Sequence, residues 1–221
     1  MADFSKPCAA CRIASRAAQG GNLGGLLTLS EKRAVYLPDY DPEDIDVQIS
    51  ELLVATNDGA DPLVDPQVRE ALGAYRKHLG MDVVFVSQFE NKRRTFRVVE
   101  SKPGVTLLQV GQSDPVEQSW CQHVVSGRLP QLMKDAQPYV DNGAAPRVDI
   151  RIGTHLSTPI LMRNGSVYGT LCCFSHEVCE QVGGKDLHRL QAMARVLAGK
   201  LEVGATTQEP QLQPMEPPAR R

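Results

Sequence analysis

The pattern of apolar and polar positions divides the chain into three parts. Apolar positions are most regularly spaced over about residues 67–202, whereas the preceding 66 residues are mixed. The last stretch, 204–221, consists mainly of Gln, Pro, Glu and Thr, and such a composition buries too little surface to offset the entropy of ordering. The pattern predicts an N-terminal extension over 1–66, one domain over 67–203 and a disordered tail over 204–221.

Periodicity and turn signals predict the elements of the central part. Asp65 and Pro66 are typical of a helix start, because Asp can cap the free backbone N–H groups and Pro fits the first turn. Asn164 and Gly165 are a strong signal for a tight turn between two strands. The expected elements are, in order, a helix over 66–78, strands over 83–89 and 95–100 joined by a turn at 91–94, a helix over 113–126, a short strand at 132–133, a polar loop over 135–148, strands over 155–162 and 166–175, and a helix over 185–203.

This order of helices and strands indicates an α+β fold in which helices cover an antiparallel sheet. In the N-terminal extension, the apolar runs 26–29 and 34–37 flank four polar residues and predict a hairpin. A short helix is expected over 47–55. The extension is too small and broken to form a domain of its own, so we expect it to pack against the residues that follow.

Composition and charge exclude several classes of partner. The chain has 221 residues, of which 24 are basic and 26 acidic, giving a net charge of −2. Such a balance gives no long-range attraction for nucleic acid or for an anionic membrane. No apolar run approaches the roughly 18–20 residues that span a bilayer, and the first residues contain no secretion signal. We therefore expect a cytoplasmic protein without nucleic-acid or membrane partners.

Several segments resemble the GAF family in sequence, order and spacing. The clearest are IGTHLSTPILM at 152–162 and NGSVYGTLCCFSH at 164–176. QSWCQHVVSG at 118–127 is similar to the helix that this family places before a loop, and LPQLMKDA at 129–136 is similar to its short strand. DLHRLQAMARVLAGKLE at 186–202 resembles its exit helix.

The resemblance implies about six antiparallel strands with helices on both faces, and a small pocket roofed by a helix and a loop. Members bind cyclic nucleotides, tetrapyrroles, haem or small metabolites, and the sequence is most similar to GAF domains found beside cyclic-di-GMP phosphodiesterase or cyclase modules in bacteria. Because few residues follow Glu202, we expect no such module in this protein. The resemblance thus implies a non-catalytic sensory protein that binds a small molecule without a covalent bond and signals through a homodimer or a partner protein. An adaptor whose pocket is filled by side chains is the alternative.

Strand periodicity gives the first candidates for the pocket. Alternation places Tyr168, Thr170, Cys172 and Phe174 on one face of their strand, and Ser157 shares a face with His155. Small polar groups among apolar ones suit either a ligand cleft or a core with satisfied hydroxyls, and both remain open. With the resemblance, the candidate ligand-binding residues are Trp120, Cys121, Val124, Asp135, Ser157, Tyr168, Thr170 and Cys172.

The sequence lacks the residues of the known catalytic and chromophore-binding members. Gln122 separates Cys121 from His123, and the acidic motif that accompanies covalent bilin attachment is missing. Free-methionine-sulfoxide reductases need a cysteine pair that includes the loop corresponding to 139–150, which contains no cysteine here. The expectation is therefore no catalytic residue, no cofactor and no enzyme activity. The alternative is a redox or metal protein that uses Cys121, Cys172 or Cys173.

Two metal sites can be considered. Cys8 and Cys11 could form half of a zinc site, with His176 and Cys179 as the second half, although two ordinary thiols are the simpler interpretation. The acidic segment 39–46 lacks the central Gly and the terminal Glu of a calcium loop, so we expect a solvated turn there. The sequence predicts no bound metal.

The last helix carries apolar residues at alternating spacings of three and four. This spacing is that of a coiled-coil seam over two heptads, which is too short to hold a dimer alone. The seam could be shared across a homodimer or could pack on the sheet, and the sequence leaves both open. The residues of this candidate dimer seam are Leu187, Leu190, Ala194, Leu197 and Leu201.

Overall fold

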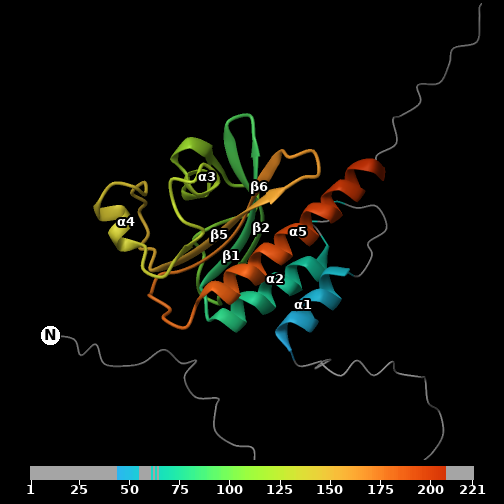
Figure 1. Cartoon of the computed structure of the whole chain (residues 1–221), viewed down its shortest axis with the longest axis horizontal. Coiled ribbons are helices and arrows are strands. Elements are labelled where there is room, and N and C mark those ends of the chain that lie inside the picture. Colours follow the sequence, from blue (N-terminus) through green and yellow to red (C-terminus); the bar gives the residue numbers. More distant parts are fainter. Residues whose placement is uncertain (1–43, 55–60, 62, 64, 208–221) are drawn as a thin grey trace, which may run out of the picture. The chain divides into compact units, whose positions relative to one another are not determined.

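The computed structural model describes residues 44–54, 61, 63 and 65–207 (Figure 1). The predicted hairpin over 26–37 and the cysteines Cys8 and Cys11 lie outside these residues. The elements are α1 (Ile45–Val54), α2 (Pro66–Leu79), β1 (Val83–Glu90), β2 (Arg93–Ser101), β3 (Ser113–Pro115), the 3-10 turn η2 (Val116–Gln118), α3 (Trp120–Val125), β4 (Leu132–Met133), α4 (Gln137–Asp141), β5 (Thr154–Leu161), β6 (Val167–Ser175) and α5 (Gly184–Thr207).

The strands form one six-stranded sheet in the order β3-β2-β1-β6-β5-β4. Every neighbouring pair is antiparallel, including β1 and β6, which lie at the centre although they are far apart in sequence. This sheet confirms the predicted α+β fold class with about six antiparallel strands.

Helices cover both faces of the sheet (Figure 1). On one face, α1, α2 and α5 enclose the largest apolar core, which includes Leu72, Val84, Leu171 and Leu197. On the other face, α3 and the loops around it cover a smaller aromatic cluster, and α4 packs on a third cluster with Met133. Within the described residues, no helix is both long and apolar enough to cross a bilayer.

The start of α2 confirms the predicted cap. The carboxylate Oδ1 of Asp65 accepts a hydrogen bond from the backbone N–H of Gln67 at 2.9 Å, and Pro66 occupies the first turn. The helix ends at Gly80, whose φ of +67° lies in the left-handed region that glycine adopts without strain. Both ends of α2 are thus set by local chemistry.

The helix predicted over 113–126 is wrong in its first half. Residues 113–115 instead form β3, which pairs with the first residues of β2. Pro115 cannot donate a backbone hydrogen bond and disfavours a continuous helix through this point. The short helix α3 starts only after Ser119, whose side chain accepts a hydrogen bond from the backbone N–H of Gln122. The break brings Asp114 directly opposite Arg94.

The turn predicted at 91–94 is also shorter than expected. Asn91 and Lys92 both have positive φ values, 51° and 61°, and they connect β1 to β2 as a two-residue turn. Such a turn matches the twist of the two strands. Strand β2 therefore begins at Arg93, and Arg94 lies in the sheet and not in the turn.

A bulge overturns the predicted orientation of Tyr168. The pairing of β5 with β6 shifts between Ile160 and Leu161, so that Ile160 pairs with Gly169 and Leu161 with Val167. An extra residue at such a shift turns its side chain away from the regular alternation. Tyr168 packs against the core under α1, α2 and α5, whereas Cys172 faces α3.

The candidate dimer seam on α5 faces the sheet of its own chain. Leu190, Ala194 and Leu197 are buried in the largest core, and Leu201 packs at its edge. Leu187 is half-buried. The helix continues to Thr207, past the predicted domain end at 203. Of the two interpretations of this spacing, the geometry supports packing on the sheet.

Candidate functional site

A cavity of about 750 Å³ lies on the face of the sheet that carries α3. We call it the α3 pocket. Its lining comes from β1, β2, β3, β5 and β6, from η2 and the N-terminal end of α3, and from the loops around residues 107–112 and 146–152. Its volume lies in the range of about 300–1,000 Å³ typical of small-molecule sites.

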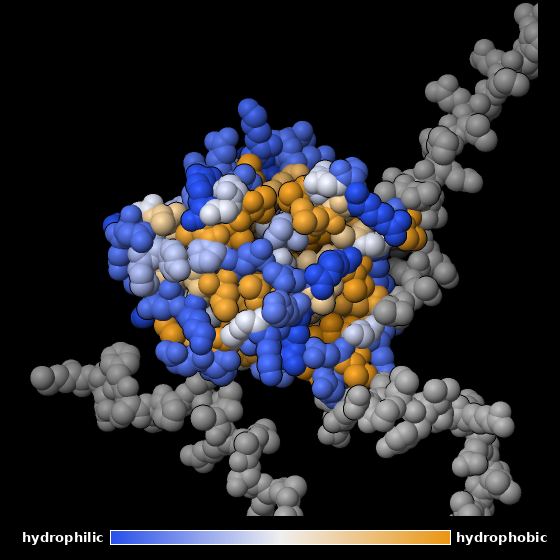
Figure 2. Space-filling view, in the orientation of Figure 1, coloured by the Kyte–Doolittle hydropathy of each residue, from blue (hydrophilic) through white to orange (hydrophobic). Residues whose placement is uncertain are grey.

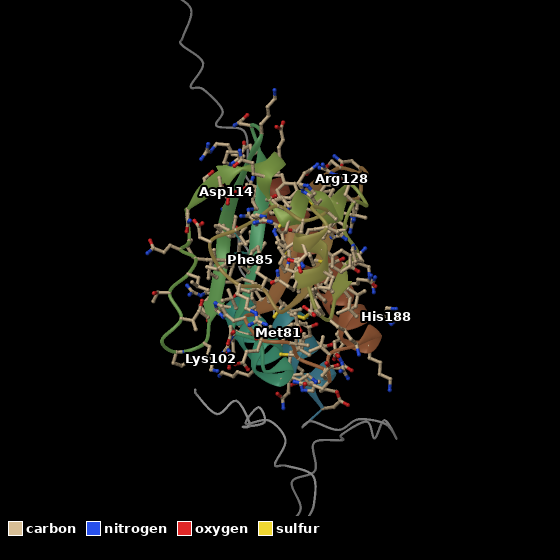
Figure 3. All side chains as sticks on the ribbon, turned by 90° about the vertical axis from the view of Figure 1, so that its left-hand side faces the viewer. Met81, Phe85, Lys102, Asp114, Arg128 and His188 are labelled. Carbon is tan, nitrogen blue, oxygen red and sulfur yellow. The ribbon has the colours of Figure 1, made fainter. Side chains whose placement is uncertain are left out.

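Three phenylalanines form the floor of the α3 pocket. Phe85 stands edge-on to Phe96, with ring centroids 5.1 Å apart, and edge-on to Phe174 at 6.4 Å. They come from β1, β2 and β6, so the sheet itself fixes their positions. Figure 3 shows this side of the molecule, with Phe85 at the middle of the sheet and the pocket residues Asp114 and Arg128 above it. The floor is a rigid apolar surface for a flat or apolar group.

Arg94 is the charged residue at the centre of the site. Its guanidinium forms a two-point ion pair with Asp114, the residue opposite it in the β2–β3 ladder. The same group lies over the Phe96 ring, with Cζ 4.7 Å from the centroid, and its Nη1 donates to Cys121 Sγ at 3.2 Å. Strand alternation places Arg94 and Phe96 on one face. Arg94 therefore joins the aromatic floor to the thiol on α3.

A network of buried polar side chains lies under α3. Cys121 Sγ is 3.4 Å from Cys172 Sγ, which is 3.0 Å from Ser157 Oγ and 3.2 Å from Thr170 Oγ1. Thr170 Oγ1 is in turn 2.9 Å from Ser87 Oγ. Ser157 and Cys172, like Ser87 and Thr170, are direct partners across neighbouring strands. The sheet register thus aligns this network, and hydrogen bonds offset the cost of burying its members.

The two thiols of this network differ in proton affinity. The hydrogen bond from Cys172 and the positive charge of Arg94 outweigh burial and hold the pKa of Cys121 below its ordinary value. Burial raises the pKa of Cys172 well above its ordinary value, and the neighbouring Cys121 adds to this effect. The pair therefore loses its first proton from Cys121, while Cys172 stays protonated.

His155 lies in the wall of the pocket beside Trp120. The two rings are edge-on at 5.4 Å, and the indole N–H of Trp120 donates to the backbone oxygen of Pro146 at 2.8 Å. His155 is only 2% exposed, and its Nδ1 has no hydrogen-bond partner among the residues that the structure describes. An unpaired buried nitrogen costs about 1–3 kcal/mol. The site therefore contains one polar atom that the described part of the fold leaves unsatisfied.

Because His155 is buried, we expect the protein to lose stability in acid. Burial lowers its pKa to about 3, and the charge of Arg94 contributes in the same direction. In the unfolded chain a histidine has a pKa of about 6.5, so between these two values the unfolded state binds more protons than the folded state. The free energy of unfolding must then decrease as the pH falls through this window, by about 2–3 kcal/mol between about pH 7 and about pH 4.5.

Urea unfolding of the wild type and of His155→Phe across this window measures the effect. Phenylalanine keeps an aromatic contact with Trp120 but cannot take up a proton. Acid titration of other groups, such as Asp82, is common to both proteins and cancels in the comparison. The variant is expected to lose less stability than the wild type, and equal losses would contradict a buried neutral His155.

The structure brings together five of the eight candidate pocket residues. Trp120 and Cys121 line the pocket, and Ser157, Thr170 and Cys172 lie directly beneath Cys121 in the polar network. The other three lie elsewhere. Val124 is buried between α3 and α4, and Tyr168 faces the opposite side of the sheet. Asp135 is exposed and accepts a hydrogen bond from the backbone N–H of Gln137.

The main residues that the sequence analysis missed are Arg94, Asp114, His155 and the phenylalanines Phe85 and Phe96. Arg94 and Phe96 alternate along β2, so the sequence would place them on one face if the strand were known to start at Arg93. Asp114 gave no signal, because its role depends on pairing between β2 and β3.

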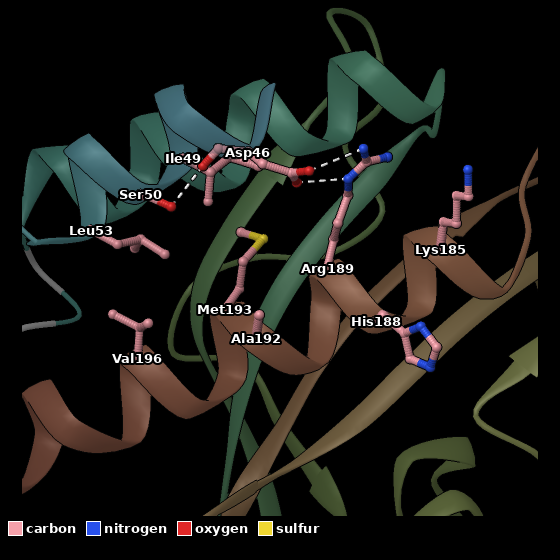
Figure 4. Close-up of a pocket in the computed structure, with 10 residues that line it drawn as sticks. All are labelled: Asp46, Ile49, Ser50, Leu53, Lys185, His188, Arg189, Ala192, Met193 and Val196. Carbon is pink, nitrogen blue, oxygen red and sulfur yellow. Dashed lines mark hydrogen bonds and ion pairs between the residues drawn. The ribbon is translucent and has the colours of Figure 1, made fainter. Parts of the chain in front are cut away.

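A second cavity, of about 460 Å³, lies between α1 and α5 (Figure 4). Ile49 and Leu53 face Met193 and Val196 across it, and the ion pair of Asp46 with Arg189 crosses it at one end. Apolar side chains reach the surface in the region of α1 and α5 (Figure 2). The polar part of its described lining comes from Asp46, Ser50, Lys185, His188 and Arg189.

The described residues contain no cluster of three or more His, Cys, Asp or Glu side chains that could hold a metal ion. Of the zinc ligands considered from the sequence, His176 Nδ1 lies 2.7 Å from Asp82 Oδ2 and Cys179 is buried, whereas Cys8 and Cys11 lie outside the described part.

No protein-family model matches the sequence, and no curated protein matches it. The fold does match solved structures. The GAF domain of a phosphoenolpyruvate-protein phosphotransferase from Acinetobacter is 13% identical, with a TM-score of 0.56 over 75% of this chain and 94% of that chain. The chromophore-binding domain of a bacteriophytochrome from R. palustris is 14% identical, with a TM-score of 0.56 over 75% of this chain and 61% of that one.

A free methionine-R-sulfoxide reductase from Neisseria meningitidis, solved in complex with its substrate, is 13% identical. It aligns with a TM-score of 0.56 over 78% of this chain and 98% of that chain. Identities this low establish architecture and no shared chemistry. With its six-stranded antiparallel sheet and helices on both faces, the chain has the GAF fold that its sequence resemblance predicted.

Proposed function

We propose that this protein is a sensory module that binds a small organic molecule in the α3 pocket without a covalent bond. The observation that carries the proposal is the pocket itself, about 750 Å³ in volume and open between the sheet and α3. An adaptor with a filled pocket would have side chains in this space. The cavity therefore favours a ligand-binding protein over a pure scaffold.

The lining indicates the chemical class of the ligand. Phe85, Phe96 and Phe174 offer an apolar floor, and Leu107 and Ile150 add apolar walls. Basic side chains, Arg94, Arg128 and Arg147, face the same space. Arg94 already pairs with Asp114, and the lining also contains the acidic residues Glu117 and Asp149, so acidic and basic side chains balance in number. A flat, partly aromatic molecule that carries polar groups at its edge matches this arrangement.

A bound molecule can act as a signal only by favouring one conformation over another. The pocket is roofed by short loops and by α3, which is six residues long, so small movements there would change the surface that a partner meets. We propose that the signal leaves through association with a partner protein or a second copy of the chain. The buried side of α5 does not supply that surface.

Anilinonaphthalene sulfonate is a suitable probe, because its flat aromatic rings match the apolar floor of the pocket and its sulfonate is a polar group at the edge of these rings. We expect the purified protein to bind one equivalent with a rise in fluorescence. Leu108→Trp places a larger side chain in the α3 pocket and is expected to weaken binding about tenfold or more. Fluorescence titration measures the stoichiometry and the affinity of both proteins.

Ala192→Trp is the matched control, since Ala192 lines the groove between α1 and α5. It is expected to bind the probe like the wild type. Loss of binding in Ala192→Trp and normal binding in Leu108→Trp would place the probe in the groove and contradict the proposal. The absence of saturable binding in the wild type would do so as well.

A further inference from the structure

We propose that Cys121 and Cys172 form a redox-active dithiol in which Cys121 reacts with a small hydroperoxide and Cys172 then closes a disulfide. This inference uses the α3 pocket as a route of access but does not depend on the proposed ligand. It rests on the distance between the two sulfurs, on the contact of Cys121 with Arg94 and on the position of Cys121 in the pocket wall.

The two sulfurs are close enough to bond after a small movement. They lie 3.4 Å apart, on α3 and on the central strand β6, in segments separated by 51 residues of sequence. A disulfide bond is about 2.05 Å long, so the sulfurs would have to approach by roughly 1.3 Å. Helix α3 is short and lies at the edge of the pocket, whereas β6 is held between β1 and β5, so α3 is the element that moves.

The side chains around the two thiols assign Cys121 as the nucleophile and Cys172 as the resolving thiol. Arg94 Nη1 lies 3.2 Å from Cys121 Sγ and stabilises a thiolate there. Cys172 is hydrogen-bonded to Ser157 and Thr170, and no basic side chain among the described residues forms a hydrogen bond with it. The lowered pKa of Cys121 and the raised pKa of Cys172 agree with these roles.

Access also singles out Cys121. It lines the α3 pocket, whereas Cys172 lies behind it and is fully buried. Cys121 itself is only 1% exposed, so an oxidant must be small enough to enter the pocket. Cys173 is the neighbour of Cys172 in sequence, yet it faces the core under α2 and α5, and burial raises the pKa of its thiol.

The chemistry balances without a further reactant. The Cys121 thiolate attacks one oxygen of the hydroperoxide, the O–O bond breaks, and the alkoxide or hydroxide leaves and takes a proton. Cys121 is now a sulfenic acid. The sulfur of Cys172 attacks the sulfur of Cys121, the S–O bond breaks, and hydroxide leaves as water with the proton of Cys172. Two thiols are oxidised by two electrons, and the peroxide is reduced to an alcohol and water.

Hydrogen peroxide added to the reduced 221-residue protein tests the proposal. The chain should carry Cys8→Ser and Cys11→Ser, so that these two cysteines do not react. We expect mass spectrometry to find a Cys121–Cys172 disulfide that a dithiol reductant reverses. Cys172→Ser should stop at a sulfenic acid on Cys121, which dimedone traps, whereas the matched variant Cys173→Ser should still form the disulfide.

Arg94→Met tests the activation of Cys121. It should slow the oxidation by about tenfold or more, because the thiolate loses its cation. Circular dichroism shows whether Arg94→Met is folded. If it is not, the proposal is tested by Cys172→Ser and Cys173→Ser alone. Unreacted Cys121 in the folded wild type, or a disulfide that forms in Cys172→Ser but not in Cys173→Ser, would overturn the proposal.

Discussion

Gly169→Ala is expected to destabilise the domain severely. Gly169 lies on β6 at the bulge, where the backbone of β1 comes very close. A Cβ atom at this position would stand 1.9 Å from the carbonyl oxygen of Ser87 and 2.8 Å from its carbonyl carbon. Neither atom can move away, because both belong to β1, one of the two central strands of the sheet. The clash would cost on the order of 4 kcal/mol or more, a large part of the 5–15 kcal/mol that stabilises a typical domain.

Gly73→Ala is the control for this prediction, because it is expected to raise the free energy of unfolding and not to lower it. Gly73 lies within α2, and a Cβ atom there would meet no other atom within 4 Å. Alanine should stabilise the helix by about 0.5–1 kcal/mol, because it loses less backbone entropy than glycine. Urea unfolding of both variants, with circular dichroism as the readout, measures the effects. If Gly169→Ala folds with a free energy close to that of the wild type, the close approach of β1 and β6 is wrong.

Leu197→Glu is expected to unfold the protein. Leu197 is completely buried between α5 and the sheet. The substitution removes a packed side chain, worth about 2–5 kcal/mol, and places a carboxylate in an apolar core without a partner. This result would assign the apolar seam of α5 to the core. If Leu197→Glu stays folded and turns a dimer into a monomer in light scattering, the seam is an interface between chains.

Val196→Glu is the matched control for this helix. Val196 is the neighbouring residue but is 38% exposed, at the edge of the groove between α1 and α5. A charge at this position remains solvated, so a change in unfolding free energy of less than about 0.5 kcal/mol is expected. Unfolding of both variants would mean that α5 does not tolerate the substitution for reasons other than burial.

Much of the fold could be predicted because its signals are local. The cap at Asp65, the turn at Asn164 and Gly165 and the strand pattern of β1, β5 and β6 each depend on a few neighbouring residues. The errors fall where contacts distant in sequence decide the backbone. Residues 113–115 carry a helix-like pattern but pair with β2, and Tyr168 follows a strand pattern that the bulge interrupts.

The α3 pocket was only partly predictable for the same reason. Trp120 and Cys121 were identified from a family resemblance, and Thr170 and Cys172 from alternation along one strand. Arg94 and Asp114 become neighbours through the β2–β3 ladder, 20 residues apart in sequence. Cys121 and Cys172 become neighbours because α3 covers β6, across 51 residues. No local pattern encodes these pairings, since the first arises from the register of the sheet and the second from the packing of α3 on the sheet.

The sequence by itself determined the α+β class, the likeness to GAF domains and the positions of most helices and strands, because capping, turn chemistry and hydrophobic periodicity act over short distances. The tertiary structure alone decided that a cavity remains under α3, that Arg94 pairs with Asp114 and contacts Cys121, and that the α5 seam faces the core. These features depend on which elements meet and in what register, and that is set by packing the whole sheet.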